Sequence, residues 1–194
     1  MESLETQQNP VSQNNQVKFT YEDYLLTPEG KFYELIDGEL LMTPSPTFYH
    51  QNTSKILFRI LDRFISENKL GEVLYAPMDV YLSDENVVQP DILFLAKSSL
   101  KKITPRCIKG APDLVIEILS PGTETRDLVT KRKLYRKFGV KEYWIVDPDK
   151  KNIEVMTWQG SEFKTLVTYP EHAFFSSPLF QGLSFKISEV FGNL

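Results

Sequence analysis

The 194-residue sequence is poor in the side chains that hold soft metals or form cross-links. It contains one cysteine, Cys107, and two histidines, His50 and His172. A single cysteine excludes an internal disulfide and argues against a cysteine-based zinc site, and two histidines argue against a histidine cluster. A glycine-rich phosphate loop and a G-x-S-x-G nucleophile element are also absent from the sequence. Disulfide scaffolds, zinc sites and serine-hydrolase chemistry are therefore poor candidates.

Long apolar runs are missing as well. No stretch approaches the ~18 residues that suggest a membrane span, and residues 1–17 lack the basic and apolar regions of a signal peptide. Because these residues are rich in Gln and Asn, we expect a disordered tail at 1–17 and a single domain at 18–194. With no membrane segment expected, the predicted location is the cytoplasm.

Negative charge predominates, but it is unevenly distributed along the chain. The formal net charge is −4. Residues 97–141 hold twelve Lys and Arg against four Asp and Glu, a net of +8, which leaves −12 for the remaining residues. A basic segment in an acidic protein suits a polyanionic ligand that approaches from one side. An ordinary lysine-rich helix surface explains the same pattern equally well.

Hydrophobic periodicity predicts a chain of mixed α/β (α+β) class. Asp37-Gly38 lies between two apolar runs, which is the strongest short signal for a β-hairpin. Residues 48–68 have the spacing of a long amphipathic helix. Shorter helices are predicted over residues 21–26, 97–103 and 126–138, the last ending at Gly139. Strands are expected over residues 71–82 (bulged or ended near Pro77), 87–95, 113–119, 142–147, 153–158 and 163–167.

Two acidic residues interrupt apolar strands in the middle of the chain. Glu117 lies within residues 113–119, whose two faces are both apolar enough to be covered. A carboxylate buried there costs several kcal/mol unless it is paired, so we expect Glu117 to bind a partner or a metal. The alternative is a Glu at a strand end that reaches solvent. Asp91 follows Pro90 in another apolar run, either as a second site carboxylate or as the end of a strand.

One lysine of the basic helix is expected to point inward. At ~100° per residue, Lys131 lies at the centre of an arc that also contains Asp127, Leu134, Tyr135 and Phe138. Asp127, one turn earlier, would hold Lys131 in place. Tyr135, one turn later, would hydrogen-bond a phosphate or simply pack. The alternative is that Lys131 extends past the apolar stripe to water.

Two further candidates come from the first half of the chain. Glu34 shares a strand face with Phe32 and Ile36. It is expected either to point inward, as an outer metal ligand or proton acceptor, or to pair across the hairpin or remain exposed. His50 lies in the first turn of the long helix, where a capping or core-edge position is the default and a supporting role in a site is the alternative.

These residues predict a hard-metal site. If Asp91 and Glu117 lie on neighbouring strands, their charges repel unless a cation lies between them or one is protonated. Oxygen ligands select Mg²⁺, Mn²⁺ or Ca²⁺, and Mg²⁺ usually takes one or two carboxylates together with waters and phosphate oxygens. The backbone carbonyl of Ile118 would add a further ligand. Such an ion lowers the pKa of bound water, and Lys131 would orient that water or stabilise the transition state.

The order of these residues resembles a known family. Pro90-Asp91, followed 26 residues later by Glu117 and then Ile118-Leu119, is similar to the PD-(D/E)XK motif of restriction-endonuclease-like nucleases. More narrowly, five blocks over about residues 20–191 resemble the bacterial Uma family of endonucleases: ELIDGELL, QPDILF, PDLVIEILSP, RDLVTKRKLY and GVKEYWIVDP. The resemblance implies a mixed β-sheet flanked by helices, with an N-terminal β-hairpin. It also implies a Mg²⁺-dependent (or Mn²⁺-dependent) phosphodiesterase centre that acts on DNA.

The chain departs from the superfamily motif at one position. The superfamily lysine stands two residues after the glutamate, where this sequence has Leu119. The resemblance implies a lysine that has migrated, and Lys131 is its match; Arg126, Arg132 and Lys133 are then expected to contact nucleic acid. Two other functions fit the residues. One is a nucleic-acid-binding module with a decayed nuclease centre, and the other is an oligomeric interaction protein, such as a homodimer paired through an edge strand.

Overall fold

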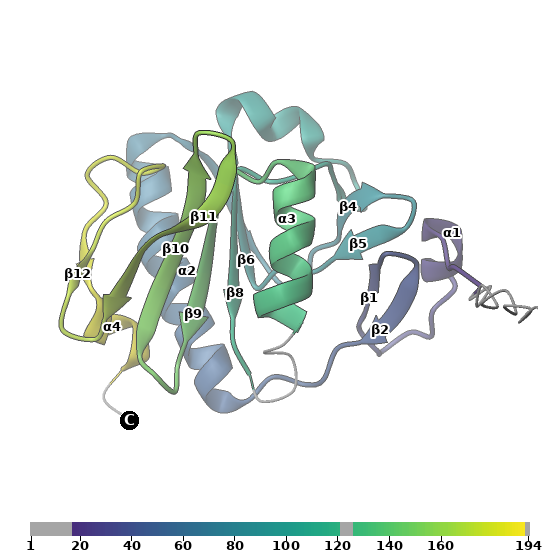
Figure 1. The fold of residues 1–194 in the computed structure, drawn as a ribbon, viewed down its shortest axis with the longest axis horizontal. Coiled ribbons are helices and arrows are strands. Elements are labelled where there is room, and N and C mark those ends of the chain that lie inside the picture. Colours follow the sequence, from purple (N-terminus) through teal and green to yellow (C-terminus); the bar gives the residue numbers. More distant parts are fainter. Residues whose placement is uncertain (1–16, 121–125, 193–194) are drawn as a thin grey trace, which may run out of the picture.

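The computed structural model describes residues 17–120 and 126–192, so the tail predicted at 1–17 lies almost wholly outside the described residues. The chain forms three β-sheets flanked by helices, which confirms the predicted α/β class with an N-terminal β-hairpin. A six-stranded sheet stands at the centre, with the long helix α2 on one face and α3 on the other (Figure 1). A smaller five-stranded sheet lies beside it.

The strands divide among the sheets without following the chain order. The six-stranded sheet has the order β11-β10-β9-β8-β6-β3, in which β8 and β9 run parallel and the other neighbours antiparallel. Its strands are β3 (Gly71–Tyr75), β6 (Ile92–Ala96), β8 (Leu114–Ile118), β9 (Glu142–Asp147), β10 (Asn152–Gln159) and β11 (Glu162–Pro170). The five-stranded sheet has the order β2-β1-β5-β4-β7 and contains β1 (Tyr33–Ile36), β2 (Glu39–Met42), β4 (Val80–Ser83), β5 (Asn86–Val88) and β7 (Ile108–Lys109). A third sheet pairs β12 (Phe174–Phe175) with β13 (Phe185–Lys186).

The helices agree with the predicted positions, except that α1 and the start of the 126–138 segment differ and α4 was not predicted. They are α1 (Tyr21–Tyr24), α2 (Phe48–Asn68), the 3₁₀ segment η1 (Lys97–Lys102), the π-helical segment η2 (Arg126–Lys131), α3 (Arg132–Phe138) and α4 (Ile187–Phe191). α1 ends two residues earlier than predicted. The segment 126–138 begins as a π-helix, whose i→i+5 turns are wider than α-helical ones, so the 100° wheel holds only from Lys131 onward. No helix in the described ranges is both long and apolar enough to cross a membrane.

The hairpin forms and helix α3 ends for the reasons that the sequence suggested. Asp37 and Gly38 adopt φ values of 49° and 83°, the left-handed pair that a tight two-residue hairpin turn requires. Ile36 consequently pairs with Glu39 across the turn. Gly139, with φ 79°, ends α3 in the left-handed conformation that glycine adopts without strain.

Two segments predicted as strands are each divided at a proline. Residues 71–82 form β3 and β4 on either side of Pro77, and residues 87–95 form β5 and β6 on either side of Pro90. The two halves of each segment belong to different sheets, since β3 pairs with β6 and β4 pairs with β5. Proline donates no backbone hydrogen bond, so the ladder stops there and the chain changes sheet. The predicted interruption near Pro77 is therefore confirmed, whereas the prediction of a single strand over residues 87–95 was wrong.

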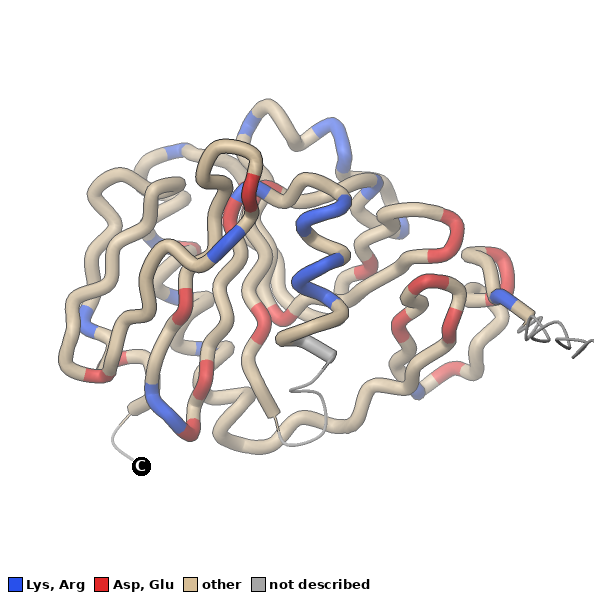
Figure 2. Tube along the Cα trace, in the orientation of Figure 1, with Lys and Arg blue, Asp and Glu red and all other residues tan. Residues whose placement is uncertain are grey.

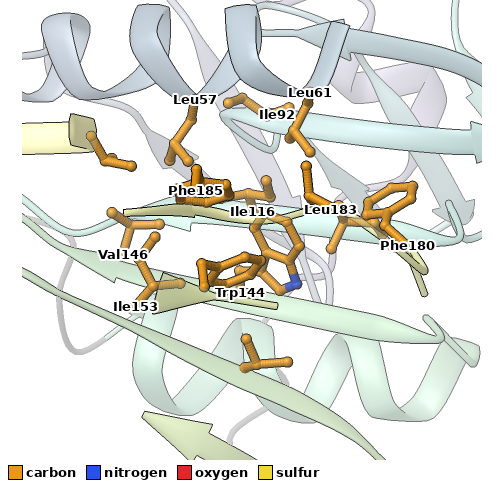
Figure 3. Close-up of a cluster of buried hydrophobic side chains, with 14 of the residues drawn as sticks. Leu57, Leu61, Ile92, Ile116, Trp144, Val146, Ile153, Phe180, Leu183 and Phe185 are labelled. Atoms are coloured by element: carbon orange, nitrogen blue, oxygen red, sulfur yellow. The ribbon is translucent and has the colours of Figure 1, made fainter. Parts of the chain in front are cut away.

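The residues of the six-stranded sheet alternate between two cores. Ile116 and Trp144 belong to the core against α2, where they lie among the side chains shown in Figure 3. Val115 and Tyr143 belong to the core against α3. Because successive strand residues point to opposite faces, Glu117 faces the α3 side, next to Val115 on the same face. The fold thus directs this carboxylate toward the helix that follows it in sequence.

We expect Leu61→Ala to destabilise the protein strongly. Leu61 is fully buried between α2 and the six-stranded sheet, and its truncation should leave a cavity that lowers the free energy of unfolding by about 2–5 kcal/mol. Urea denaturation followed by circular dichroism measures this loss. Leu26 is 83% exposed, so Leu26→Ala is the matched control and should change the free energy by less than about 0.5 kcal/mol. Equal losses in the two variants would contradict this placement of the core.

Candidate active site

A pocket opens where the two large sheets meet. Its walls come from β1, the start of α2, the two proline breaks between the sheets, the end of β8 and the end of η2. Six of the residues singled out in the sequence line it, namely Glu34, His50, Asp91, Glu117, Ile118 and Lys131. The structure therefore brings together side chains that are widely separated in the sequence.

The amine of Lys131 lies between two buried carboxylates. Its Nζ atom is 2.9 Å from Glu34 Oε1 and 3.0 Å from Glu117 Oε1. Glu34, Glu117 and Lys131 are 2%, 3% and 4% exposed, so water contributes little to the solvation of any of the three charges. Each charge depends on the others for compensation. Lys131 thus points inward rather than past the apolar stripe to water, and Glu34 also points inward.

Tyr135 holds Glu117 from the side of α3. Its hydroxyl donates a hydrogen bond to Glu117 Oε1 at 2.5 Å, and its ring packs edge-on against Tyr143. Burial raises the pKa of the Tyr135 phenol well above its ordinary value, and the nearby charges of Glu117 and Glu34 act in the same direction. The phenol therefore keeps its proton and acts as a donor. Tyr135 is fully buried, so it supports Glu117 from the core side of the pocket. In this structure its hydroxyl is not placed to contact a phosphate directly.

Asp91 is fixed opposite Glu117 by the backbone of β8. The antiparallel register that pairs Ile92 with Ile116 places Asp91, one residue before β6, across from Glu117. Asp91 Oδ2 accepts a hydrogen bond from the Ile118 backbone N–H at 2.7 Å. Its second oxygen, Oδ1, makes no hydrogen bond within the part of the chain that the structure describes. One oxygen of Asp91 is thus held by the strand, and the other remains for a ligand.

His50 combines a place in the helix cap with a contact in the site. Its backbone N–H donates to the Oγ1 atom of the N-cap residue Thr47 at 3.2 Å. Its ring Nε2 lies 3.2 Å from Asp91 Oδ2. His50 therefore lies in the capped first turn of α2 and contacts Asp91 from there, and its supporting role in a site stays a prediction.

Sequence reasoning missed Gln89. Its backbone N–H donates to Glu34 Oε1 at 3.0 Å, and its side-chain amide donates to Asp79 at 2.8 Å and to the Tyr24 hydroxyl at 3.2 Å. Gln89 lines the pocket and ties Glu34 to the segment that precedes Asp91. The available signal was its position directly before Pro90-Asp91 in the QPDILF block.

The remaining predicted residues do not line this pocket, or their side chains lie outside the described residues. The side chains of Arg126 and Asp127 belong to the latter group, so the predicted contact between Asp127 and Lys131 stays a prediction. Arg132 is half-buried and Lys133 is exposed on α3, and neither is among the residues that line the pocket.

The charges of the pocket favour a divalent cation. Three carboxylates and one ammonium give a formal charge of −2 when His50 is neutral. Among the described residues no group of three or more His, Cys, Asp or Glu side chains is arranged to hold a metal. Ligation by Asp91 and Glu117, which the β6–β8 register places across from each other, would supply the one or two carboxylates that Mg²⁺ usually takes. The residues present fit Mg²⁺ or Mn²⁺, and the Ile118 carbonyl as a further ligand stays a prediction.

Comparison with known proteins gives a consistent result. Residues 20–188 match the Uma2 family, which is described as "Putative restriction endonuclease". Among solved structures, the chain is similar to a "putative nuclease belonging to DUF820" from Anabaena variabilis ATCC 29413. The two share 21% sequence identity with a TM-score of 0.74, over 89% of this chain and 97% of that one. No curated protein matches the chain.

The family match and the structural match support different conclusions about this chain. The likeness to the Anabaena protein shows the fold, because its sequence identity is low. The family description supports a nuclease as the general class of function. Since the family match extends over residues 20–188 of a 194-residue sequence, this chain belongs to the Uma2 family.

Proposed function

We propose that this protein is a Mg²⁺-dependent DNA endonuclease, with Mn²⁺ able to replace Mg²⁺. The buried cluster of Glu34, Lys131 and Glu117 beside Asp91 supports this proposal most directly. Buried ion clusters are expensive, and well-packed apolar side chains often stabilise a protein equally well. A cluster that borders a pocket and carries net negative charge is therefore better explained by a task than by stability.

The chain's own residues divide the work in this proposal. Asp91 and Glu117 hold the cation, which when bound lowers the pKa of a water molecule and neutralises charge on the phosphate. Lys131 presents a fixed positive charge and hydrogen-bond donors to the attacking water or to the transition state. Tyr135 and His50 hold Glu117 and Asp91 in place from outside the reaction.

Glu34 has a positioning role in this scheme. Its Oε1 atom binds Lys131 and is itself fixed by the Gln89 N–H. The superfamily's usual lysine position is occupied by Leu119, which has no donor to offer. Lys131 reaches Glu117 from the following helical segment, and Glu34 keeps the Lys131 amine at that location.

A nucleic-acid-binding protein without catalysis is the second candidate. It is favoured by one observation, namely that Lys131 already forms ion pairs with two carboxylates and so reduces the negative charge available to a cation. This alternative predicts salt-sensitive DNA binding that a chelator does not change.

We expect a supercoiled plasmid to be cleaved in Mg²⁺ or Mn²⁺ and to remain intact with chelator. Asp91→Ala and Glu117→Ala should each lower the cleavage rate at least ~100-fold, because each removes a ligand of the proposed cation that acts on the water and the phosphate. Asp62, an exposed carboxylate on α2, supplies the control Asp62→Ala, which should cleave at the parent rate. Parent-like cleavage by both site variants would reject the centre, and chelator-insensitive binding without cleavage would select the second candidate.

Lys131→Ala should separate cleavage from metal binding. Its removal changes the formal charge of the pocket from −2 to −3, so the affinity for Mn²⁺, measured by titration calorimetry, should be retained or increased. The cleavage rate should nevertheless fall ~100-fold, since a donor to the transition state is lost. Lys186→Ala, at an exposed lysine on β13, should leave both quantities unchanged. A parallel fall in metal affinity and rate would argue against the role assigned to Lys131.

The buried cluster should also be visible in stability measurements. Lys131→Met leaves Glu34 and Glu117 buried without their shared cation and should lower the free energy of unfolding by about 3–5 kcal/mol. Adding Glu34→Gln removes one negative charge, so the double variant should recover part of this loss. Urea denaturation compares the three proteins, and a single variant as stable as the parent would mean that Lys131 is not buried between the carboxylates.

A further inference from the structure

Helix α3 carries a second set of cations that the pocket does not use. Leu134 and Tyr135 face the core, whereas Lys133, Arg136 and Lys137 are exposed. The spacing i, i+3, i+4 places these three cations on one side of the helix, and Figure 2 shows basic segments repeating along α3. In the described residues none of the three forms an ion pair. Lys137 Nζ lies 5.3 Å from the centroid of the Phe138 ring, a contact that does not neutralise its charge. The three charges are therefore available to an anionic ligand.

The turn between β10 and β11 completes a groove beside these cations. The groove is lined by Lys133, Arg136, Lys137, Trp158 and Ser161. Trp158 is 39% exposed, although its Nε1 donates to the Val140 carbonyl at 2.9 Å and its ring packs on Phe163 at 5.3 Å between centroids. The indole is thus held by hydrogen bonding and packing while part of it stays open to solvent.

The chemistry of this groove fits nucleic acid. No carboxylate is among its lining residues, although the whole chain has a net charge of −4. Adjacent cations repel each other, and a polyanion relieves that repulsion. An acidic peptide would neutralise the cations, but it does not carry the planar bases that stack on an exposed indole. Cations that follow a phosphate backbone, together with an aromatic ring on which a base stacks, are how proteins bind single strands.

The groove is connected to the candidate active site through one helical segment. Lys131, whose amine lies in the pocket, directly precedes α3 and is two residues before Lys133. At ~1.5 Å per residue, the segment from Lys131 to Lys137 rises about 9 Å. An extended single strand spaces its phosphates more widely than the ~3.4 Å axial rise of duplex DNA, so no more than two or three nucleotides are needed to cover that length. A strand bound in the groove would therefore lie a few nucleotides from the pocket.

We propose that the groove formed by Lys133, Arg136, Lys137 and Trp158 binds a single-stranded segment of the substrate. The three cations contact successive phosphates, and one base stacks on the indole of Trp158. This assignment takes its nucleic-acid partner from the nuclease function proposed above, but binding in the groove does not require cleavage. It extends the contact predicted for Lys133 into a defined surface with an aromatic component.

The charges are tested by Lys133→Gln, Arg136→Gln and Lys137→Gln combined in one protein. With chelator present, its affinity for a fluorescent single-stranded deoxyoligonucleotide of about 12 nucleotides should fall at least ~10-fold. The slope of log K against log salt should become shallower by about 2, since each phosphate contact contributes ~0.7. The control combines Arg59→Gln, Lys69→Gln and Lys186→Gln, which removes the same charge from exposed positions on α2, its C-terminal cap and β13. An equal loss in the control would overturn the groove.

The stacking contact is tested by tryptophan fluorescence. The chain has two tryptophans, and Trp144 is fully buried, so quenching by the oligonucleotide should come from Trp158. Trp158→Phe keeps an aromatic ring and should still bind but lose the quench, whereas Trp158→Ala should bind at least about fivefold more weakly. A quench that persists in Trp158→Phe, or duplex DNA that binds as tightly as the single strand without quenching, would overturn stacking in the groove.

The same proteins distinguish failure of the groove from failure of the nuclease. Oligonucleotide binding that depends on the groove, in a parent protein that does not cleave, would keep the groove and reject the catalytic centre. Plasmid cleavage and oligonucleotide binding that are both unchanged in the triple variant would reject the groove and keep the centre. A change in oligomeric state on sedimentation, with oligonucleotide binding unchanged, would assign the surface to contacts between copies of this chain and would also overturn the proposal.

Discussion

The interaction on which the site depends is the burial of one ammonium group between two carboxylates. Lys131 is held by Glu34 from β1 and by Glu117 from β8, so two sheets and a helical segment must meet at one point. The cost of desolvating these charges is offset only while all three remain together. The positions of the five-stranded sheet, of β8 and of the α3 segment are thus coupled through charges as well as through apolar packing.

Two proline breaks and the contacts of β8 bring these elements to one point. Pro77 and Pro90 end the ladders of β3 and β5, so the chain passes between the sheets there and leaves room for a pocket. Asp91 lies at the second crossing, where the backbone of β8 fixes it. The alternation of strand residues then directs Glu117 toward α3, and Tyr135 from that helix completes its hydrogen bonding.

Much of this arrangement could be predicted from local signals. Asp37-Gly38 specified a hairpin because few other dipeptides adopt two left-handed residues, and the spacing of Leu57 and Leu61 specified the α2 face. The inward position of Lys131 was predictable because residues 131–138 follow α-helical phase. The π-helical start of that segment was not, since no local signal in the sequence specifies i→i+5 bonding.

The pairing of Lys131 with Glu34 was also beyond the sequence, because it depends on how the two sheets are placed. The contact of Gln89 with Glu34 is made by its backbone N–H, so the residue type at this position does not reveal it.

The central claim is that Asp91, Glu117 and Lys131 surround the position of a catalytic cation. A crystal of the protein soaked in Mn²⁺ and measured at the manganese absorption edge tests it most directly. The account predicts one strong anomalous peak between the carboxylates of Asp91 and Glu117, with the Lys131 amine still within hydrogen-bonding distance of Glu117. Full Mn²⁺ soaking that gives no peak there, or a Lys131 side chain turned into solvent, would contradict it.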